Sequence, residues 1–301
     1  SKIGITIPVG KDSLSMQTSW DKEDDEYSIT APLSLVISAF APVGNVKKVI
    51  TPQLKNEEGS ILMLVDLGLG LNRMGGSCLS QVYNRNLGET PDIDNPELLK
   101  NFFDAITELK SKDLIMAYHD RSDGGLFSCI AEMTFAGNLG AEITLRAASN
   151  NEVLKHLFSE ELGCVIQINS QDLNNVEDIM DKFSLSKHTK KIGKVINEKS
   201  ISIHDDSQNL EFFDLIELRE AWSKMSYEMQ HLRDNPTTAR EGFDNLLDEN
   251  NPGLNPRINF SSDKIDYKRP DISSPRVAIL RDQGVNSQIE MAVAFQKAGF
   301  N

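Results

Sequence analysis

Residues 114–126, LIMAYHDRSDGGL, decide both the fold and the candidate site of this chain. An apolar, strand-like run leads into a loop with two aspartates, a serine and a Gly-Gly pair. A helix pattern follows at once, with Leu126, Ile130 and Met133 on one face. Amides at a helix start bind phosphate, and carboxylates bind divalent cations. The loop therefore predicts a site for a nucleotide and a metal ion.

Strand-like and helix-like segments alternate on both sides of this loop. Leu33, Leu35 and Ile37 alternate with less apolar residues, as in a half-buried strand. Further strands are predicted at residues 61–67, 141–145, 164–168, 191–196 and 201–204, and helices at 96–109, 153–158 and 172–183. This order predicts an α+β or α/β domain over residues 31–205.

The C-terminal third has a different pattern. Apolar residues from Leu215 to Leu232 recur at helical spacing, which predicts one long helix whose apolar face packs in a core. Residues 234–275 are rich in Asn, Pro, Asp and Ser and predict a linker. Residues 276–280 then predict a strand, and Ser287 with Glu290 predicts a capping box for a final helix. One strand and one helix cannot bury their own faces, so we expect a piece of a longer polypeptide.

Composition narrows the class of protein. The 301 residues, 39% hydrophobic and 25% charged, predict one or two globular domains. The net charge of −14 excludes broad attraction to nucleic acid or anionic lipid. Cys78, Cys129 and Cys164 form no CxxC pair and predict buried thiols in a reducing compartment. No apolar run has the length of a membrane span and no signal sequence is present, so a cytoplasmic location is predicted.

The loop offers several candidate ligands. Asp120 and Ser122 are two residues apart in an extended segment, which directs both side chains to one side beyond a strand end, and we favour binding roles for both. Asp123 could bind a ligand or cap the following helix. His119 could act as an acid or base, although pairing with a neighbouring carboxylate is the more frequent role of such a residue.

Two other loops are open to two interpretations each. The motif GKDSLSM, with Lys11 and Asp12, could hold phosphate and metal or form a capped turn, and it lacks the spacing of a phosphate loop. The backbone amides of Gly75, Gly76 and Ser77 could bind phosphate, or these residues could form a turn into a short helix.

The chain contains, in this order, GKDSLSM, APLSLVISAFAPV, GGSCLSQVY, AYHDRSDGGLFSCIAEMTFAG, ELG with VIQI, LRDNP, NPGLN and RVAILRDQGVNSQIEMAVAFQKAGF. This order closely resembles the large, single-chain phosphoribosylformylglycinamidine synthase family, or formylglycinamide ribonucleotide amidotransferases, over nearly the whole chain. The resemblance implies the end of an ATP-binding N-type domain at 1–30 and an aminoimidazole-ribonucleotide-synthetase-like C-type domain at 31–205. It implies a helix and linker at 206–274 and the first β–α unit of a class I, flavodoxin-like glutaminase domain at 275–301.

The resemblance also implies a reaction. The family is an ATP- and glutamine-dependent ligase that converts formylglycinamide ribonucleotide to its amidine in purine biosynthesis. Glutamine supplies ammonia, ATP activates the amide oxygen, and ammonia displaces phosphate. The resemblance implies that Asp120 is a magnesium ligand and Ser122 a nucleotide contact, in a second ATP/ADP site with a structural role.

The resemblance gives this chain no catalytic residue, because the glutaminase Cys, His and Glu would lie beyond Asn301. The isolated chain is therefore expected to be inactive, and its expected partners are the rest of the same polypeptide and the three substrates. Two alternatives stay open: a non-catalytic, nucleotide-binding scaffold, and a related kinase or synthetase that makes selenophosphate or thiamine diphosphate. The motif beginning RVAILRDQG disfavours the second, since those relatives carry no fused glutaminase.

Overall fold

The chain folds as two compact units, Ser1–Asp248 and Glu249–Asn301. The computed structural model describes residues 2–7, 10, 16–22, 25–31, 35–147, 149–204, 209–261 and 275–301. Each unit is described by itself below. None of the helices in these ranges combines the length and apolarity that a bilayer crossing needs.

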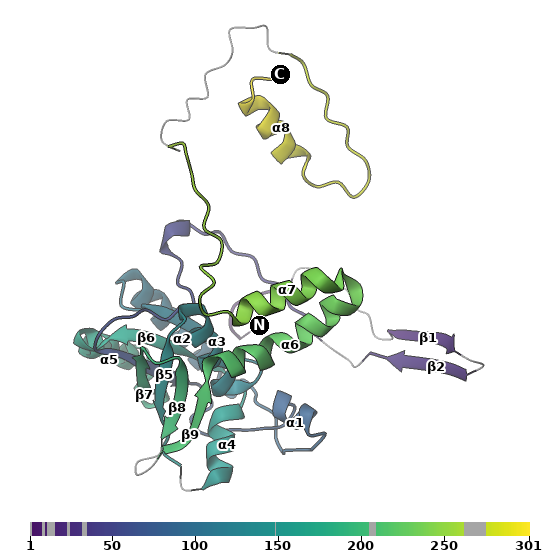
Figure 1. The fold of residues 1–301 in the computed structure, drawn as a ribbon. Coiled ribbons are helices and arrows are strands. Elements are labelled where there is room, and N and C mark those ends of the chain that lie inside the picture. The colour runs from purple at the N-terminus through teal and green to yellow at the C-terminus, as the bar shows by residue number, and fades with distance from the viewer. Residues whose placement is uncertain are drawn as a thin grey trace. The chain divides into compact units, whose positions relative to one another are not determined.

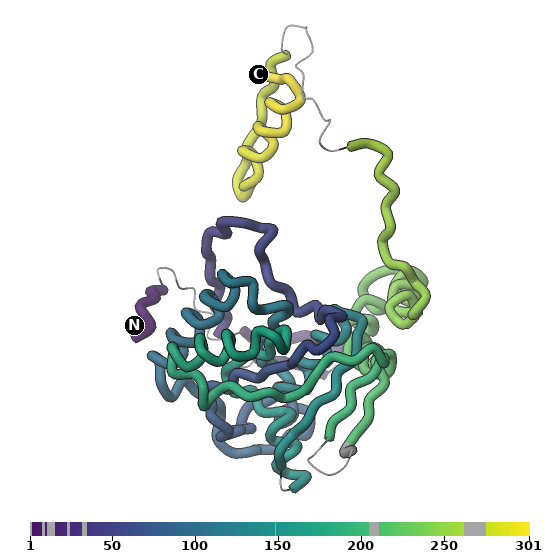
Figure 2. The backbone as a smooth tube through the Cα atoms, turned by 90° about the vertical axis from the view of Figure 1, so that its left-hand side faces the viewer, coloured from purple at the N-terminus to yellow at the C-terminus, as the bar shows by residue number. Residues whose placement is uncertain are grey.

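A mixed seven-stranded sheet forms the centre of the first unit, in the order β4-β6-β3-β7-β5-β8-β9. The strands are β3 (Ser60–Asp66), β4 (Ala117–Asp120), β5 (Gly140–Thr144), β6 (Gly163–Asn169), β7 (Thr189–Ile196), β8 (Ser200–His204) and β9 (Asn209–Asp214). All neighbouring strands are antiparallel except β5 and β8. Figures 1 and 2 show β8 and β9 side by side at one edge of the sheet.

Helices follow most of the strands along the chain. In the first unit they are α1 (Cys78–Val82), α2 (Pro96–Ser111), α3 (Gly125–Gly137), α4 (Asn150–Phe158), α5 (Leu173–Lys182), α6 (Leu215–Arg233) and α7 (Pro236–Leu247). Short 3-10 turns occupy Val46–Lys48, Ser170–Asp172 and Ser186–His188, and β1 (Gln17–Lys22) pairs with β2 (Asp25–Thr30) as a hairpin. As the sequence predicts, Asn95 caps α2 and Pro96 is its first residue.

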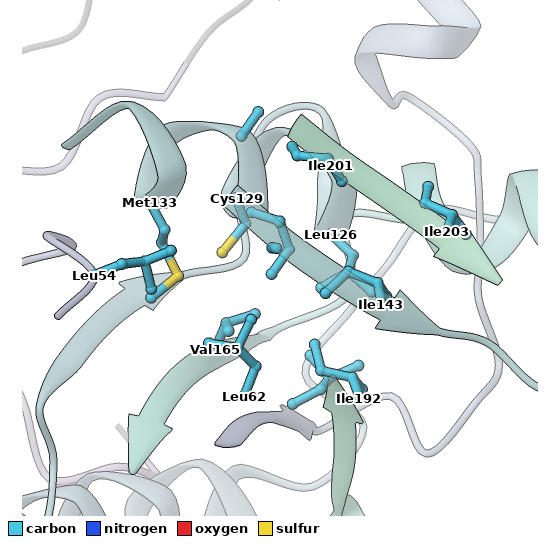
Figure 3. Close-up of a cluster of buried hydrophobic side chains, with 14 of the residues drawn as sticks. Leu54, Leu62, Leu126, Cys129, Met133, Ile143, Val165, Ile192, Ile201 and Ile203 are labelled. Carbon is cyan, nitrogen blue, oxygen red and sulfur yellow. The ribbon is translucent and has the colours of Figure 1, made fainter. Parts of the chain in front are cut away.

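Two hydrophobic clusters cover the two faces of the sheet. Because successive strand residues point to opposite faces, Leu62 and Leu64 of β3 pack in the cluster that contains α3, shown in Figure 3. Ile61 and Met63 pack in the other cluster, with α2 and α5. Every residue of β3 is buried as a result, which explains its unbroken apolar run.

The α+β prediction is confirmed for the sheet, and each strand and helix predicted between residues 61 and 204 is present within a few residues of its expected bounds. Cys129 and Cys164 are buried free thiols, as predicted, whereas Cys78 is half-buried. Burial raises the pKa of the Cys129 thiol to about 12, which keeps it protonated and inert at neutral pH.

Some sequence predictions outside that region are wrong. Residues 35–43 form no strand, and Leu35 and Ile37 are exposed. Residues 5–7, whose Ile-Thr-Ile alternation also predicts a strand, have no strand assignment either. Conversely, the acidic run near Asp21, whose charges predict a solvated loop, contributes to the β1–β2 hairpin. These segments have no covered face among the described residues, so alternation alone was a poor guide.

The long helix is present as α6, but its apolar stripe is only partly packed. Leu215 is buried, and the Trp222 ring lies edge-on to Phe135 of α3 at 5.8 Å. Met225 and Met229 are 74% and 62% exposed, so the packing interpretation fails for the second half of the helix. Helix α7, where only a linker was expected, begins with the same Asn-Pro signal as α2 and packs beside α6 (Figure 1).

In the second unit, α8 (Gln288–Lys297) is the predicted final helix, but Ser287 makes no side-chain cap hydrogen bond. The strand predicted at residues 276–280 is wrong, because these residues have no strand assignment. Val277 N donates to Asn301 O, and Asn301 N donates to Pro275 O. The ranges 249–261 and 275–301 contain no strand with which residues 276–280 could form further hydrogen bonds.

Candidate nucleotide and metal site

One end of the sheet gathers the candidate site residues. Asp66, the last residue of β3, lies opposite Gly163 of β6, and Asp120, the last residue of β4, lies opposite Cys164. On the other side of β3, Val65 lies opposite Thr189, the first residue of β7. The loops that leave β3 and β4 therefore meet the chain that enters β6 and β7.

A buried ion pair forms the floor of this end. Asp66 and Arg121 are each only 4% exposed, and a guanidinium nitrogen of Arg121 donates to Asp66 Oδ1 at 2.5 Å. Arg121 Nε also donates to the Glu161 carbonyl at 2.6 Å. The Asp66 carboxylate accepts the amides of Gly68 at 3.2 Å and Gly70 at 2.8 Å. The pair thus fixes the loops after β3 and β4 to each other.

The Asp66–Arg121 pair makes the free energy of unfolding depend on pH. Burial raises the pKa of the Asp66 carboxyl, but the charge and hydrogen bonds of Arg121 and the Gly70 amide outweigh it, so the net pKa lies below its ordinary value of 3.8. A carboxyl with a lowered folded-state pKa contributes stability above its unfolded-state pKa, and that stability is lost as pH falls through the folded-state pKa. Below about pH 4 we expect the urea concentration at the unfolding midpoint to decrease. This decrease should be smaller in Asp66→Asn, which lacks the titrating carboxyl. Equal pH dependence in both proteins would contradict this assignment.

The predicted metal ligand, Asp120, is exposed at the surface of this floor. Its Oδ1 accepts the Tyr118 hydroxyl at 2.5 Å, and its second oxygen has no hydrogen-bond partner among the described residues. Ser122 is exposed as well, whereas Arg121 between them is buried. A carboxylate with one oxygen oriented and the other open suits a hard cation such as Mg²⁺.

The start of α3 depends on its two glycines. Gly124, with φ of 80°, is the N-cap residue and Gly125, with φ of 69°, follows it, so Asp123 does not cap this helix. Gly124 N donates to Glu160 Oε1 at 2.8 Å, and Cys78 N donates to the same oxygen at 2.8 Å. Glu160 therefore holds the loop before α1 beside the loop before α3.

Most amides of the Gly75–Ser77 loop already have partners within the chain. Gly75 N donates to the Glu89 carbonyl at 2.7 Å and Ser77 N to the Met74 carbonyl at 3.3 Å. The Ser77 hydroxyl oxygen caps α1 by accepting the Ser80 amide at 3.2 Å. The turn into a short helix is thus present, and phosphate binding by Gly75, Gly76 and Ser77 stays a prediction. Lys11 and Asp12 lie outside the described residues.

Three potential metal ligands converge beside the loop. Ligand atoms of Cys78, Asp123 and Glu160 all lie within 4.8 Å of one another. Burial, followed by the nearby Glu160 charge, raises the pKa of the Cys78 thiol. A protonated thiol is a poor metal ligand, so this group offers a hard cation two carboxylates. Asp120 is not a member of the group.

His119 takes the structural role weighed for it in the sequence. Its Nε2 lies 2.8 Å from Glu132 Oε2, and its Nδ1 lies 2.8 Å from the Asp120 carbonyl oxygen. The other oxygen of Glu132 accepts the Trp222 indole N–H at 3.0 Å. Pairing with a carboxylate is thereby confirmed for His119, which also connects the loop to α6.

Sequence reasoning missed the charged residues that support the loop, namely Asp66, Arg73, Glu160 and Glu161. Arg73 donates through Nε to Glu161 at 2.7 Å and also contacts Asp94 at 2.8 Å, while Glu161 is only 1% exposed. A signal for Asp66 was available, because a carboxylate at the end of a fully apolar strand needs a buried partner.

Comparison with known proteins shows what two parts of this chain are similar to. Residues 57–206 match the family model described as AIR synthase related protein, C-terminal domain. Over these residues the chain is similar to AIR synthase related C-terminal domains, and they contain most of its mixed sheet. Residues 1–42 match the FGAR-AT PurM_N-like domain, and the two matches together support the FGAR-AT family for this chain.

Solved structures with similarity to this chain include two of PurL from Thermotoga maritima. The complex with ADP is 15% identical, with a TM-score of 0.44, and the match covers 84% of this chain and 34% of that one. The complex with FGAR is 16% identical, with a TM-score of 0.46, and covers 57% and 30%. HypE from E. coli, a hydrogenase maturation protein, is 19% identical, with a TM-score of 0.39, and covers 54% and 52%. The chain thus spans about a third of the PurL chains.

Proposed function

We propose that this chain is part of an ATP- and glutamine-dependent ligase, a phosphoribosylformylglycinamidine synthase. This enzyme would convert formylglycinamide ribonucleotide to formylglycinamidine ribonucleotide in purine biosynthesis. The observation that carries the proposal is the order of two domain matches, FGAR-AT PurM_N-like at 1–42 and AIR synthase related at 57–206. The motifs quoted above support the same assignment, and the glutaminase assignment of residues 275–301 rests on that resemblance.

Within this enzyme, Asp120 would hold Mg²⁺ and Ser122 would contact the nucleotide. Both are exposed on a loop whose position the buried Arg121 fixes, and Asp120 keeps one carboxylate oxygen open while the other accepts the Tyr118 hydroxyl. When bound, Mg²⁺ would offset phosphate charge. The chain's own residues would orient and retain the nucleotide, and none of them is assigned to glutamine hydrolysis.

Asp120→Asn tests this assignment. The change removes the negative charge but keeps the size and the acceptor for Tyr118. We expect at least about a tenfold weaker Mg²⁺-dependent nucleotide affinity, which corresponds to about 1.4 kcal/mol. Calorimetric titration of the complete gene product with MgADP would measure it, with Asp104→Asn on the exposed face of α2 as the matched control. Unchanged affinity in Asp120→Asn would remove this residue from the metal site.

A non-catalytic scaffold is the second candidate. It is favoured because Gly75, Ser77, Cys78 and Gly124 all donate their amides within the chain, so the loops are stable without a reacting ligand. Formation of amidine from formylglycinamide ribonucleotide, ATP and ammonia separates the two. A complete gene product that forms amidine supports the ligase, and turnover by the 301-residue chain alone would exclude the scaffold. A complete gene product that retains nucleotide without turnover would support the scaffold.

A further inference from the structure

A cavity with a volume of about 540 Å³ opens on the sheet face that carries α3 and α4. Its size falls within the range of about 300–1,000 Å³ common for small-molecule sites. Its lining contains no acidic residue among the described residues. It consists of Leu64, Asn72, Arg121, Leu126, Thr144, Leu145, Arg146, His156, Lys190, Lys191, Ile192 and Gly193. Such a lining is unexpected in a chain with a net charge of −14.

Strand geometry directs Lys190 toward this cavity. Lys190 of β7 lies directly opposite Leu64 of β3, whose side chain packs in the cluster with α3. Residues directly opposite in an antiparallel pair share a face, as do residues two apart in one strand. Asp66 and Leu64 therefore share this face with Lys190. Lys191 lies opposite Met63, which packs in the cluster on the other face.

The positive charge in the cavity is only partly offset by carboxylates among the described residues. Asp66, whose charge acts on Lys190, already accepts Arg121 and two backbone amides. Lys190 and Arg146 have no ion pair or hydrogen bond with any of the described residues. Burial lowers the pKa of the Lys190 amine, and Arg121 lowers it further against the opposing effect of Asp66. The charged form of an amine next to a guanidinium is stabilised when an anion binds between the two groups.

His156 adds a neutral donor to the same cavity. Burial, and then the Lys190 charge, lowers the pKa of the His156 ring below its ordinary value of 6.5, so the ring is neutral at pH 7. Its Nδ1 lies 3.2 Å from the Asn72 side-chain nitrogen, which can only donate. Nδ1 is therefore the acceptor, and Nε2 carries the proton that a ligand oxygen could accept.

We propose that this cavity binds the phosphate group of a small phosphate ester, with Lys190 and Arg146 as its charged contacts. Leu126, Leu145 and Ile192 supply an apolar wall for the rest of the ligand. The proposal does not depend on the ligase function. Asp120 belongs to the other side of the loop, since it alternates with Arg121, which lines this cavity.

Calorimetric titration with inorganic phosphate tests the proposal, using the complete gene product in EDTA so that no metal-dependent site contributes. Ionic strength is held constant with chloride. We expect saturable binding in this titration, weakened at least about tenfold in Lys190→Met by loss of a charge-assisted hydrogen bond. Lys187→Met is the matched control, because it removes the same charge from an exposed residue three positions earlier that does not line the cavity. It should bind phosphate like the unchanged protein.

Each other outcome overturns the proposal. Absence of saturable binding would mean that the cavity holds no phosphate. Equal weakening in Lys190→Met and Lys187→Met would mean that phosphate responds to overall charge. If Lys190→Met folds poorly, Arg146→Met provides a second variant on an exposed residue of the same cavity. Unchanged phosphate affinity in Arg146→Met would then exclude the site.

Discussion

Arg121→Met is expected to destabilise the fold by about 3–5 kcal/mol, as removal of one partner of a buried ion pair typically does. The variant leaves the Asp66 carboxylate without its counterion in a position that is 4% exposed. It also removes the donors to the carbonyls of Glu161 and Leu162, at 2.6 and 3.1 Å. The buried Glu161 carbonyl is then left without a donor, which adds its own cost, whereas the Leu162 carbonyl still accepts the Leu67 amide at 2.9 Å. Urea unfolding, followed by circular dichroism, would measure the loss.

Arg240→Met is the matched control for this change. Arg240 also pairs with a carboxylate, Asp244, at 2.9 Å, but that pair lies on the exposed surface of α7. Exposed pairs contribute little, so we expect almost no change in the urea midpoint. The double variant Asp66→Leu with Arg121→Met should recover much of the loss, because it removes both charges. A single Arg121→Met variant as stable as Arg240→Met would show that the buried pair does not hold this end of the sheet.

The same variant connects stability with the candidate site. Arg121 N donates to the Gly163 carbonyl at 2.9 Å while its side chain reaches Asp66, so one residue anchors the loop at two points. Asp120 and Ser122 flank it directly. Loss of the side-chain anchor should therefore weaken nucleotide binding at temperatures where the variant is still folded, although neither proposed ligand is altered.

The sequence predicted local structure correctly where neighbouring residues in the chain determine it. The AYHDRSDGG loop was placed correctly between a strand and a helix, because periodicity changes there and glycines mark the turn. The cap of α2 followed from Asn95 and Pro96 alone. The same Asn-Pro signal at Asn235 was passed over, since the polar composition of residues 234–275 favoured a linker.

Ion pairs between residues far apart in the sequence could not be predicted from local sequence patterns. Asp66 and Arg121 are 55 residues apart, and Arg73 and Glu161 are 88 apart, so no spacing rule connects them. The sequence therefore predicted the exposed candidate ligands Asp120 and Ser122 but not the buried charges beneath them. The strand prediction for residues 276–280 was wrong for a related reason. A strand requires a neighbouring strand, which local alternation does not reveal.

Gly125→Ala is expected to cost about 2–5 kcal/mol, the sum of a left-handed backbone penalty and overpacking. Gly125 has a φ of 69°, which an alanine adopts only with strain. A Cβ atom there would also lie 2.7 Å from the Leu157 carbonyl oxygen and 2.8 Å from the Phe158 backbone. Since backbone atoms are the obstacle, either the end of α4 or the start of α3 must move.

The matched substitution Gly242→Ala should have the opposite sign. Gly242 lies inside α7, and no atom lies within 4 Å of its would-be Cβ, so alanine should stabilise the helix by about 0.5–1 kcal/mol. Thermal unfolding of both variants gives the comparison. Because Gly124 N holds Glu160, movement at Gly125 should also separate the Asp123 loop from Cys78 and weaken nucleotide binding. If Gly125→Ala unfolds no earlier than Gly242→Ala, the close approach of α3 to α4 cannot be what sets this loop.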